Sequence, residues 1–142
     1  MKWQSTRYGY VLRLDAGEEI VGSLAAFAAE RGIRAAAFSG LGAAGDCELG
    51  FFARGTGTYV RRVFEGEYEI GSLTGNISEM EGRPFAHCHI VLGDDAFAAY
   101  TGHLFRGTVT VTCELHLVTD PDVLRRTPRP DLGFNPIDPR EG

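Results

Sequence analysis

Long hydrophobic runs are missing from this sequence. No segment reaches the roughly 18 consecutive apolar residues that a membrane-spanning helix needs. The first residues, Met1–Ser5, also lack the apolar stretch of a secretory signal peptide. We therefore expect a cytoplasmic protein with no membrane partner.

Cysteine is scarce, and its spacing argues against disulfides. The chain has three cysteines, Cys47, Cys88 and Cys113, and no Cys-x-x-Cys pair. An odd number without paired spacing is untypical of a disulfide framework. We predict three reduced, buried thiols.

Positive charge is also in short supply. The 14 lysine and arginine residues are outnumbered by 19 aspartates and glutamates, which gives a net charge of −5. This balance opposes a nucleic-acid-binding surface, although a local basic patch stays open. With 142 residues, 44% of them hydrophobic, the chain suits a single globular domain with one core.

Proline is almost absent before residue 120 and then becomes frequent. Five of the six prolines follow Asp120, and proline both fixes the backbone and removes a hydrogen-bond donor. We predict that 121–142 is a proline-rich tail without a regular core element, which either wraps over a surface or is mobile. The folded domain is then expected to span 1–120.

Alternation of apolar and polar residues, together with short apolar runs bounded by glycines, predicts strands along most of the chain. The expected strands are 8–14, 33–38, 46–52, 59–64, 68–77, the histidine-containing segment after 84, and 108–118. The last of these has the clearest pattern. Its core-facing side is expected to carry Val109, Val111, Cys113, Leu115 and Leu117.

One segment has helical periodicity instead. Its apolar stripe, which we interpret as core packing, consists of Ile20, Leu24, Phe27 and Ala28. Asp15 is the expected N-cap, Glu18 stands three residues later as in a capping box, and Gly32 is the expected C-terminal stop. One main helix among many strands predicts an α+β domain with a mostly antiparallel β-sheet.

The glycine-rich segment 40–45 has two possible interpretations, a dinucleotide-binding loop or a structural turn. Gly-Leu-Gly-Ala-Ala-Gly matches the dinucleotide-binding pattern, but that site needs a helix to begin there. The following residues, Asp46–Phe52, alternate like a strand. We therefore expect the glycines to serve a tight turn or a close backbone approach.

Three of the four histidines fall within seventeen positions: His87, His89 and His103. His87 and His89 lie two apart on a predicted strand, so both point to one face, about 7 Å apart. With His103 from a neighbouring element they could hold one metal ion, and three neutral imidazoles suit zinc with a fourth position open. The alternative is that they are structural or solvated histidines. Cys88 faces the other way and is expected in the core, and His116 is expected at a surface or interface.

Glu114 shares the polar face of its strand with His116. If that strand lies beside the histidine strand, Glu114 could support a metal ligand or act as a general base. Alternatively, and with equal support, the Glu114 carboxylate belongs to a hydrogen-bond network at a subunit contact. Glu69 is similarly ambiguous.

Several separated motifs together resemble the PPC domain family, the "plants and prokaryotes conserved" domain. The motifs are Glu69–Ile77, the His-x-His segment 84–92, Gly102–Leu104, Glu114 and the glycine run 40–45. The resemblance covers roughly residues 8 to 120. Thr101 stands where the family has a glycine, which leaves His103 in register.

This resemblance implies an α+β fold, a homotrimer, and a metal, zinc by preference, held by the clustered histidines. Plant members carry AT-hooks, which need an Arg-Gly-Arg-Pro core to enter the minor groove. Here 81–84 reads Glu-Gly-Arg-Pro and 126–130 lacks the glycine, so neither segment is an AT-hook. DNA remains only a minor alternative partner.

The function expected from the sequence is a stand-alone protein of this type that binds a divalent metal through His87, His89 and His103. The site would serve a small-molecule ligand or hydrolytic chemistry, with Glu114 as the candidate catalytic residue. The alternative is a non-enzymatic trimeric module, DNA-associated or not, with a structural metal or none.

Overall fold

Alternating residues build one antiparallel sheet, which the computed structural model describes over residues 1–139 together with a single helix. The elements are β1 (Lys2–Thr6), β2 (Gly9–Asp15), α1 (Ile20–Arg31), β3 (Ala36–Ala53), β4 (Thr58–Met80), β5 (Arg83–Gly93) and β6 (Ala99–Thr119). Strands are ordered β1-β2-β6-β3-β4-β5. The predicted α+β class with a mostly antiparallel sheet and one main helix is confirmed.

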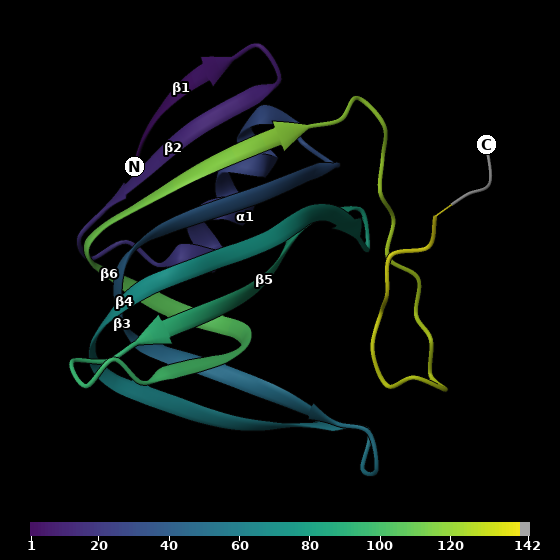
Figure 1. Ribbon diagram of the computed structural model, residues 1–142. Helices are drawn as coiled ribbons and strands as arrows, with labels where there is room; N and C mark the ends of the chain where they lie inside the picture. Colours follow the sequence, from purple (N-terminus) through teal and green to yellow (C-terminus); the bar gives the residue numbers. More distant parts are fainter. Residues whose placement is uncertain (140–142) are drawn as a thin grey trace.

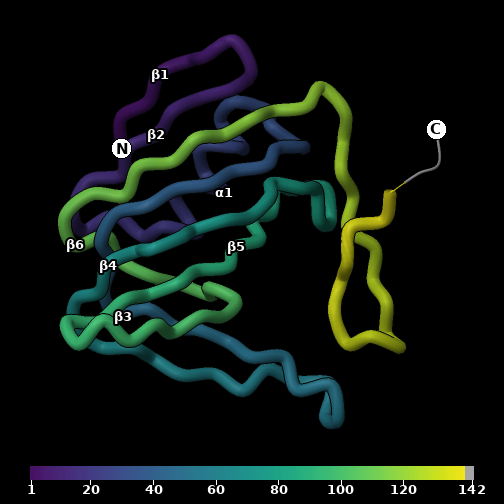
Figure 2. Tube along the Cα trace, in the orientation of Figure 1, coloured from purple at the N-terminus to yellow at the C-terminus, as the bar shows by residue number. Residues whose placement is uncertain are grey.

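The sheet closes on itself because β6 pairs with different strands along its 21 residues. Its C-terminal part pairs with β2 over 112–118, and its first residues, 99–103, pair with β5. Strand β3 lies along its other side. Figures 1 and 2 show the resulting curved sheet, in which β5 and the start of β6 lie side by side.

Helix α1 packs against β5 and β6 and covers the core. The predicted apolar stripe is fully confirmed, since all four of its residues are buried: Ile20, Leu24, Phe27 and Ala28. All three cysteines are free and buried. Burial raises the pKa of Cys88 and of Cys113 to about 12, so these thiols stay protonated at neutral pH. At 12 residues α1 cannot span a bilayer, and it is the only helix that the structure describes.

The predicted start of the helix is wrong by four residues. Glu19, rather than Asp15, is the N-cap, and its carboxylate accepts hydrogen bonds from the backbone N–H groups of Val21 and Gly22. Asp15 is the last residue of β2, and its N–H donates to Glu18 at 2.7 Å. Glutamate is not a favoured N-cap, so sequence preference selected the aspartate. Gly32 ends the helix with φ 66°, as predicted.

The glycine run 40–45 is not a turn but the middle of β3. No helix follows it, so the dinucleotide-binding pattern has no structural support. A Cβ on Gly42 would lie 2.0 Å from the carbonyl oxygen of Thr112, and one on Gly45 would lie 2.3 Å from that of Gly66. The expected close backbone approach is therefore present, between β3 and its neighbouring strands.

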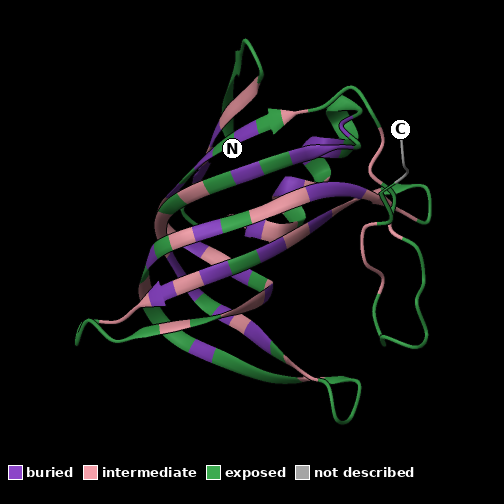
Figure 3. Ribbon diagram, turned by 45° about the vertical axis from the view of Figure 1, so that its right-hand side comes forward, coloured by how far each residue is buried: buried purple, intermediate pink, exposed green. Residues whose placement is uncertain are grey.

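Alternation along β6 is broken at one residue. Val109, Cys113, Leu115 and Leu117 are buried as predicted, but Val111 is 65% exposed. The register between β3 and β6 shifts beside it, where only Ala43 of β3 stands opposite 110–112. Figure 3 shows the regular alternation of buried and exposed residues along the strands.

The proline-rich tail lies against the sheet over its described part, 121–139. The N–H of Glu79 donates to the carbonyl of Leu124 at 2.7 Å, and the N–H of Arg126 donates back to Glu79 at 2.8 Å. The tail then turns back on itself, with the N–H of Thr127 donating to Pro136 at 3.1 Å. It forms the yellow loop of Figure 1, at the end of the molecule that also holds the β3–β4 turn. The last three residues of the tail, 140–142, lie outside the described residues.

Candidate metal centre

Strand β5 places two imidazoles on one face. His87 and His89 alternate with Ala86, Cys88 and Ile90, which are all buried in the core. His87 is half-buried and His89 is exposed on the other face. The sequence-based prediction that Cys88 points away from its two neighbours is confirmed.

Strand β6 supplies the third imidazole. His103 is the direct cross-strand partner of His89, so the two side chains leave the same face of the β5–β6 pair. His103 also lies opposite Gly50 of β3. Two adjacent strands thus bring together residues that are 14 to 16 positions apart in the chain.

The three side chains are close enough to share one ion. One ligand nitrogen from each histidine lies within 4.8 Å of the others, and the ring centroids are 5.0 to 5.5 Å apart. Ligand nitrogens around tetrahedral zinc are about 3.3 Å apart, given a bond of about 2.05 Å. Small side-chain rotations cover that difference, so the three residues fit a metal ion.

The electronic state of these imidazoles also suits a metal. Burial, then the charge of Arg126 and the other two histidines, lower the pKa of His87 to about 4. Burial is likewise the main cause that lowers the pKa of His103 to about 4. Both are therefore neutral at pH 7, with a lone pair to donate. His103 Nδ1 is buried without a hydrogen-bond partner among the described residues, as expected of an atom that awaits a ligand.

A cavity of about 730 Å³ opens over the three histidines. Its walls are largely aromatic and come from β3, β4, β5, β6 and the tail: Phe52, Tyr59, Phe85, Phe105 and Phe134. The rings pack on one another and on the site, since Phe105 lies 4.5 Å and Tyr59 lies 5.3 Å from the His103 ring. The volume and the apolar lining are typical of a small-molecule site.

The tail completes this cavity. Arg126 lines it together with residues 133–137. The Arg126 guanidinium donates to Ser78 Oγ at 2.8 Å, to Asn76 Oδ1 at 3.0 Å and to the carbonyl of Asn135 at 2.8 Å. Phe134 packs edge-on against Phe52 with ring centroids 5.4 Å apart. In this way a segment without regular secondary structure forms the roof over the histidines.

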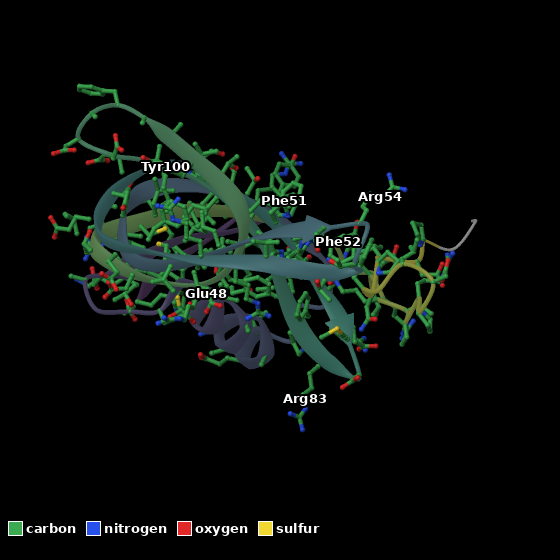
Figure 4. The ribbon with its side chains drawn as sticks, turned by 90° about the horizontal axis from the view of Figure 1, so that it is seen from below. Glu48, Phe51, Phe52, Arg54, Arg83 and Tyr100 are labelled. Carbon is green, nitrogen blue, oxygen red and sulfur yellow. The ribbon has the colours of Figure 1, made fainter. Side chains whose placement is uncertain are left out.

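Other arginines near this end of the molecule point elsewhere. Figure 4 shows Arg54 and Arg83 extending away from the body, while the end of β3 that carries Phe52 lies beside the tail. Neither Arg54 nor Arg83 lines the cavity. Arg126 is the single cationic side chain among its described lining residues.

The structure does not bring the candidate glutamates to the histidines. Glu114 is exposed and pairs with Arg13 of β2 and Leu41 of β3, 11 positions further along β6 than His103. At about 3.3 Å per residue this is roughly 35 Å of strand. Glu69 pairs with Gly93, and neither glutamate lines the cavity. The expectation that Glu114 supports the metal or acts as its base therefore lacks a geometric basis.

Sequence reasoning found the histidines but missed the roof. In the sequence, Arg126 stands out only as part of an AT-hook-like segment, and Phe134 belongs to a stretch without periodicity. The aromatic pattern of β3 and β4 could have indicated Phe52 and Tyr59. No sequence signal indicates which surface an irregular tail will cover.

The comparisons with known proteins agree with this fold. A model of the Plants and Prokaryotes Conserved (PCC) domain matches residues 3–119. No curated protein sequence matches. Among solved structures, a PPC protein from Pyrococcus horikoshii has 28% identity and a TM-score of 0.87, covering 99% of this chain and 96% of its own.

Two further solved structures carry functional descriptions. A metal-containing protein from Archaeoglobus fulgidus shares 30% identity with a TM-score of 0.85, and 97% of each chain is covered. A Bacteroides thetaiotaomicron protein, provisionally described as DNA-binding, shares 35% identity with a TM-score of 0.91, and 96% of each chain is covered. With the family match over 3–119 and these likenesses along nearly the whole length, the chain belongs to the Plants and Prokaryotes Conserved domain family.

Proposed function

We propose that this protein binds one divalent metal ion per chain through His87, His89 and His103, and uses it to hold a small molecule. The observation that carries this proposal is the meeting of three imidazole nitrogens within 4.8 Å at the foot of an open cavity. The description of the Archaeoglobus relative as metal-containing supports it.

Zinc is the metal that this ligand set favours. Three neutral imidazoles without a carboxylate or thiolate are typical of zinc sites that keep a fourth position open. When bound to these three histidines, such an ion would supply Lewis-acid polarisation of a ligand or water molecule in that position. The protein's own contribution is to keep His87 and His103 unprotonated and to surround the open position with rings that exclude water.

Binding is better supported than hydrolysis. A hydrolytic site ordinarily has a residue that can take up or deliver a proton near the reacting atoms. Among the described residues that line the cavity there is no aspartate or glutamate, and Glu114 lies far along β6. We therefore assign the cavity to ligand binding rather than to carboxylate-assisted catalysis.

The assembly that we propose is a homotrimer, as the resemblance to the family implies. Leu41 is 61% exposed and Val111 is 65% exposed, and both lie where β3 and β6 shift register. Large apolar side chains on a sheet surface are typical of subunit contacts. A cytoplasmic location remains part of this proposal.

Metal analysis of protein purified without a histidine tag and without chelator tests the central claim. Wild type is expected to carry close to one zinc per chain, and a variant with His87→Ala and His89→Ala is expected to carry none. His116→Ala is the matched control, because His116 is exposed on β6 away from the cavity and faces Ser39. Metal-free wild type that also fails to take up added zinc would refute the site.

DNA binding is a weaker second candidate, favoured by the provisional DNA-binding descriptions of the Bacteroides relative and of a relative from Ralstonia eutropha. The net charge of −5 opposes it, because affinity for DNA depends on neutralising phosphates. A filter-binding titration at low and moderate salt decides the matter. We expect no salt-dependent affinity for DNA. An affinity for DNA that falls steeply with salt would instead support DNA binding.

A further inference from the structure

Arg126 is a half-buried cation without an acidic partner among residues 1–139. Its three side-chain nitrogens donate only to neutral oxygens, those of Ser78, Asn76 and Asn135. None of the ion pairs in the described part of the chain includes it. Removing a charge from water without an opposite charge is costly, so an anion that enters the cavity would be favoured beside Arg126.

Arg126 also lies next to the candidate metal ligands. Asn76, which accepts from its guanidinium at 3.0 Å, is the cross-strand partner of His87 on the β4–β5 pair. Directly opposed residues have Cβ atoms about 5 Å apart. Arg126, His87 and His103 therefore line one cavity from two sides.

The charges in this cavity do not balance without a ligand. The three imidazoles contribute no negative charge, and the described lining contains no carboxylate. A divalent ion on the histidines would then face the Arg126 guanidinium in a partly buried space, where like charges repel strongly. A negatively charged ligand that contacts both cations relieves this repulsion.

The rest of the cavity lining is aromatic and suits the apolar part of a ligand. Phe85 lies under the guanidinium, with the Arg126 Cζ atom 5.1 Å from the ring centroid. Phe52 and Phe134 close the side toward the tail, and Tyr59 and Phe105 flank His103. A space of about 730 Å³ is ample for one ring-sized molecule.

We propose that the ligand of this cavity is a small organic carboxylate with an apolar, ring-sized body, and that Arg126 is the residue that selects its charge. The planar guanidinium matches a carboxylate in shape and can donate two parallel hydrogen bonds to it. The apolar body lies among the aromatic rings. This inference rests on the proposed metal site, but the arginine's part in it can be measured separately.

A pair of isosteric probes tests the inference. Zinc-loaded wild type is titrated calorimetrically with phenylacetate and with phenylacetamide, which have nearly the same shape and differ in charge. We expect phenylacetate to bind about tenfold more tightly or better, the value of a charge-assisted hydrogen bond. Equal affinities, or no phenylacetate binding at millimolar concentration, would overturn the proposal.

Variants of two neighbouring arginines test whether Arg126 causes the preference for phenylacetate over phenylacetamide. In Arg126→Gln we expect the preference for phenylacetate to fall about tenfold with zinc stoichiometry unchanged, and Arg126→Lys is expected to retain part of it. Arg125→Gln is the matched control, because Arg125 pairs with Glu79 outside the cavity and its loss should leave the preference intact. An unchanged preference in Arg126→Gln would show that Arg126 only fastens the tail.

Metal-free protein separates this inference from the proposed function. Without zinc, wild type should still favour phenylacetate over phenylacetamide, and Arg126→Gln should not. If the protein binds no zinc but keeps this preference, the metal site fails and the arginine's role stands. If zinc binds and the preference is absent, the role of Arg126 fails and the metal site stands.

Discussion

His89 and His103 face each other directly across the β5–β6 ladder. The candidate metal site therefore depends on strand register as much as on residue identity. A slip of one residue between these strands would turn one histidine toward the core. The pairing that closes the sheet is also the pairing that assembles the three imidazoles.

Zinc should stabilise the folded protein through these residues. At a hundredfold excess over Kd, a ligand that binds only the folded state contributes about 2.7 kcal/mol. For a domain of this size this corresponds to a rise in Tm of about 8 °C. We expect that shift in wild type by differential scanning fluorimetry and its loss in His89→Ala, because His89 is exposed and its truncation leaves the core intact. His116→Ala should behave like wild type, and a full zinc shift in His89→Ala would contradict the ligand set.

Acid should destabilise the metal-free protein through His87 and His103. Both have a pKa of about 4 in the folded state, below the ordinary value of 6.5. The unfolded chain therefore binds more protons between pH 6.5 and 4, so stability is lost as pH falls through that window. Allowing for partial solvent exposure, we expect about 2 kcal/mol in total by urea denaturation. A variant with His87→Asn and His103→Asn should lose less of its free energy of unfolding over this pH range than wild type does. A loss equal to that of wild type would contradict the lowered pKa values of the two histidines.

Gly42→Ala should strongly destabilise the fold. The new Cβ would lie 2.0 Å from the Thr112 carbonyl oxygen, and the backbone there has a φ of +148° that side chains rarely adopt. We expect a loss of about 2 kcal/mol or more in the free energy of unfolding. Gly55→Ala is the control, since a Cβ there meets nothing within 4 Å. Similar stabilities of the two variants would argue against close strand approach as the role of the glycine run.

The proposed homotrimer should depend on exposed apolar residues at the register shift. Multi-angle light scattering is expected to give three times the chain mass of 15.4 kDa for wild type. A variant with Leu41→Asp and Val111→Asp should give smaller species, because charges buried at a contact are costly. Val60→Asp, which alters an equally exposed valine on β4, should remain trimeric. A monomeric wild type would refute the assembly itself.

Local patterns predicted the parts of the molecule that depend on periodicity. Alternation placed His87 and His89 on one face, and the helical stripe identified the buried side of α1. Val111 departs from alternation because a long-range register shift exposes it, and no neighbouring residue signals that shift. The helix start was misplaced because a favoured N-cap residue, Asp15, belongs to β2.

The candidate site was predictable only at its base. His103 could be joined to the histidine strand by its motif, since both lie in regular strands. Arg126 and Phe134 reach the site through a tail whose path is set by backbone hydrogen bonds to Glu79 and by contacts with distant side chains. The role of Glu114 was conditional on its strand lying beside the histidine strand; β6 does pair with β5, but only over residues 99–103, so Glu114 does not line the cavity.

The roof of the cavity lies outside the residues that the family model matches. The family model ends at residue 119, whereas Arg126 and residues 133–137 complete the cavity. The three histidines and the tail residues that cover them are thus encoded in separate parts of the chain. If the proposed function holds, substitutions in the tail would alter what fits above the three histidines without disturbing the strands that carry them, so one histidine cluster can be combined with different ligand preferences.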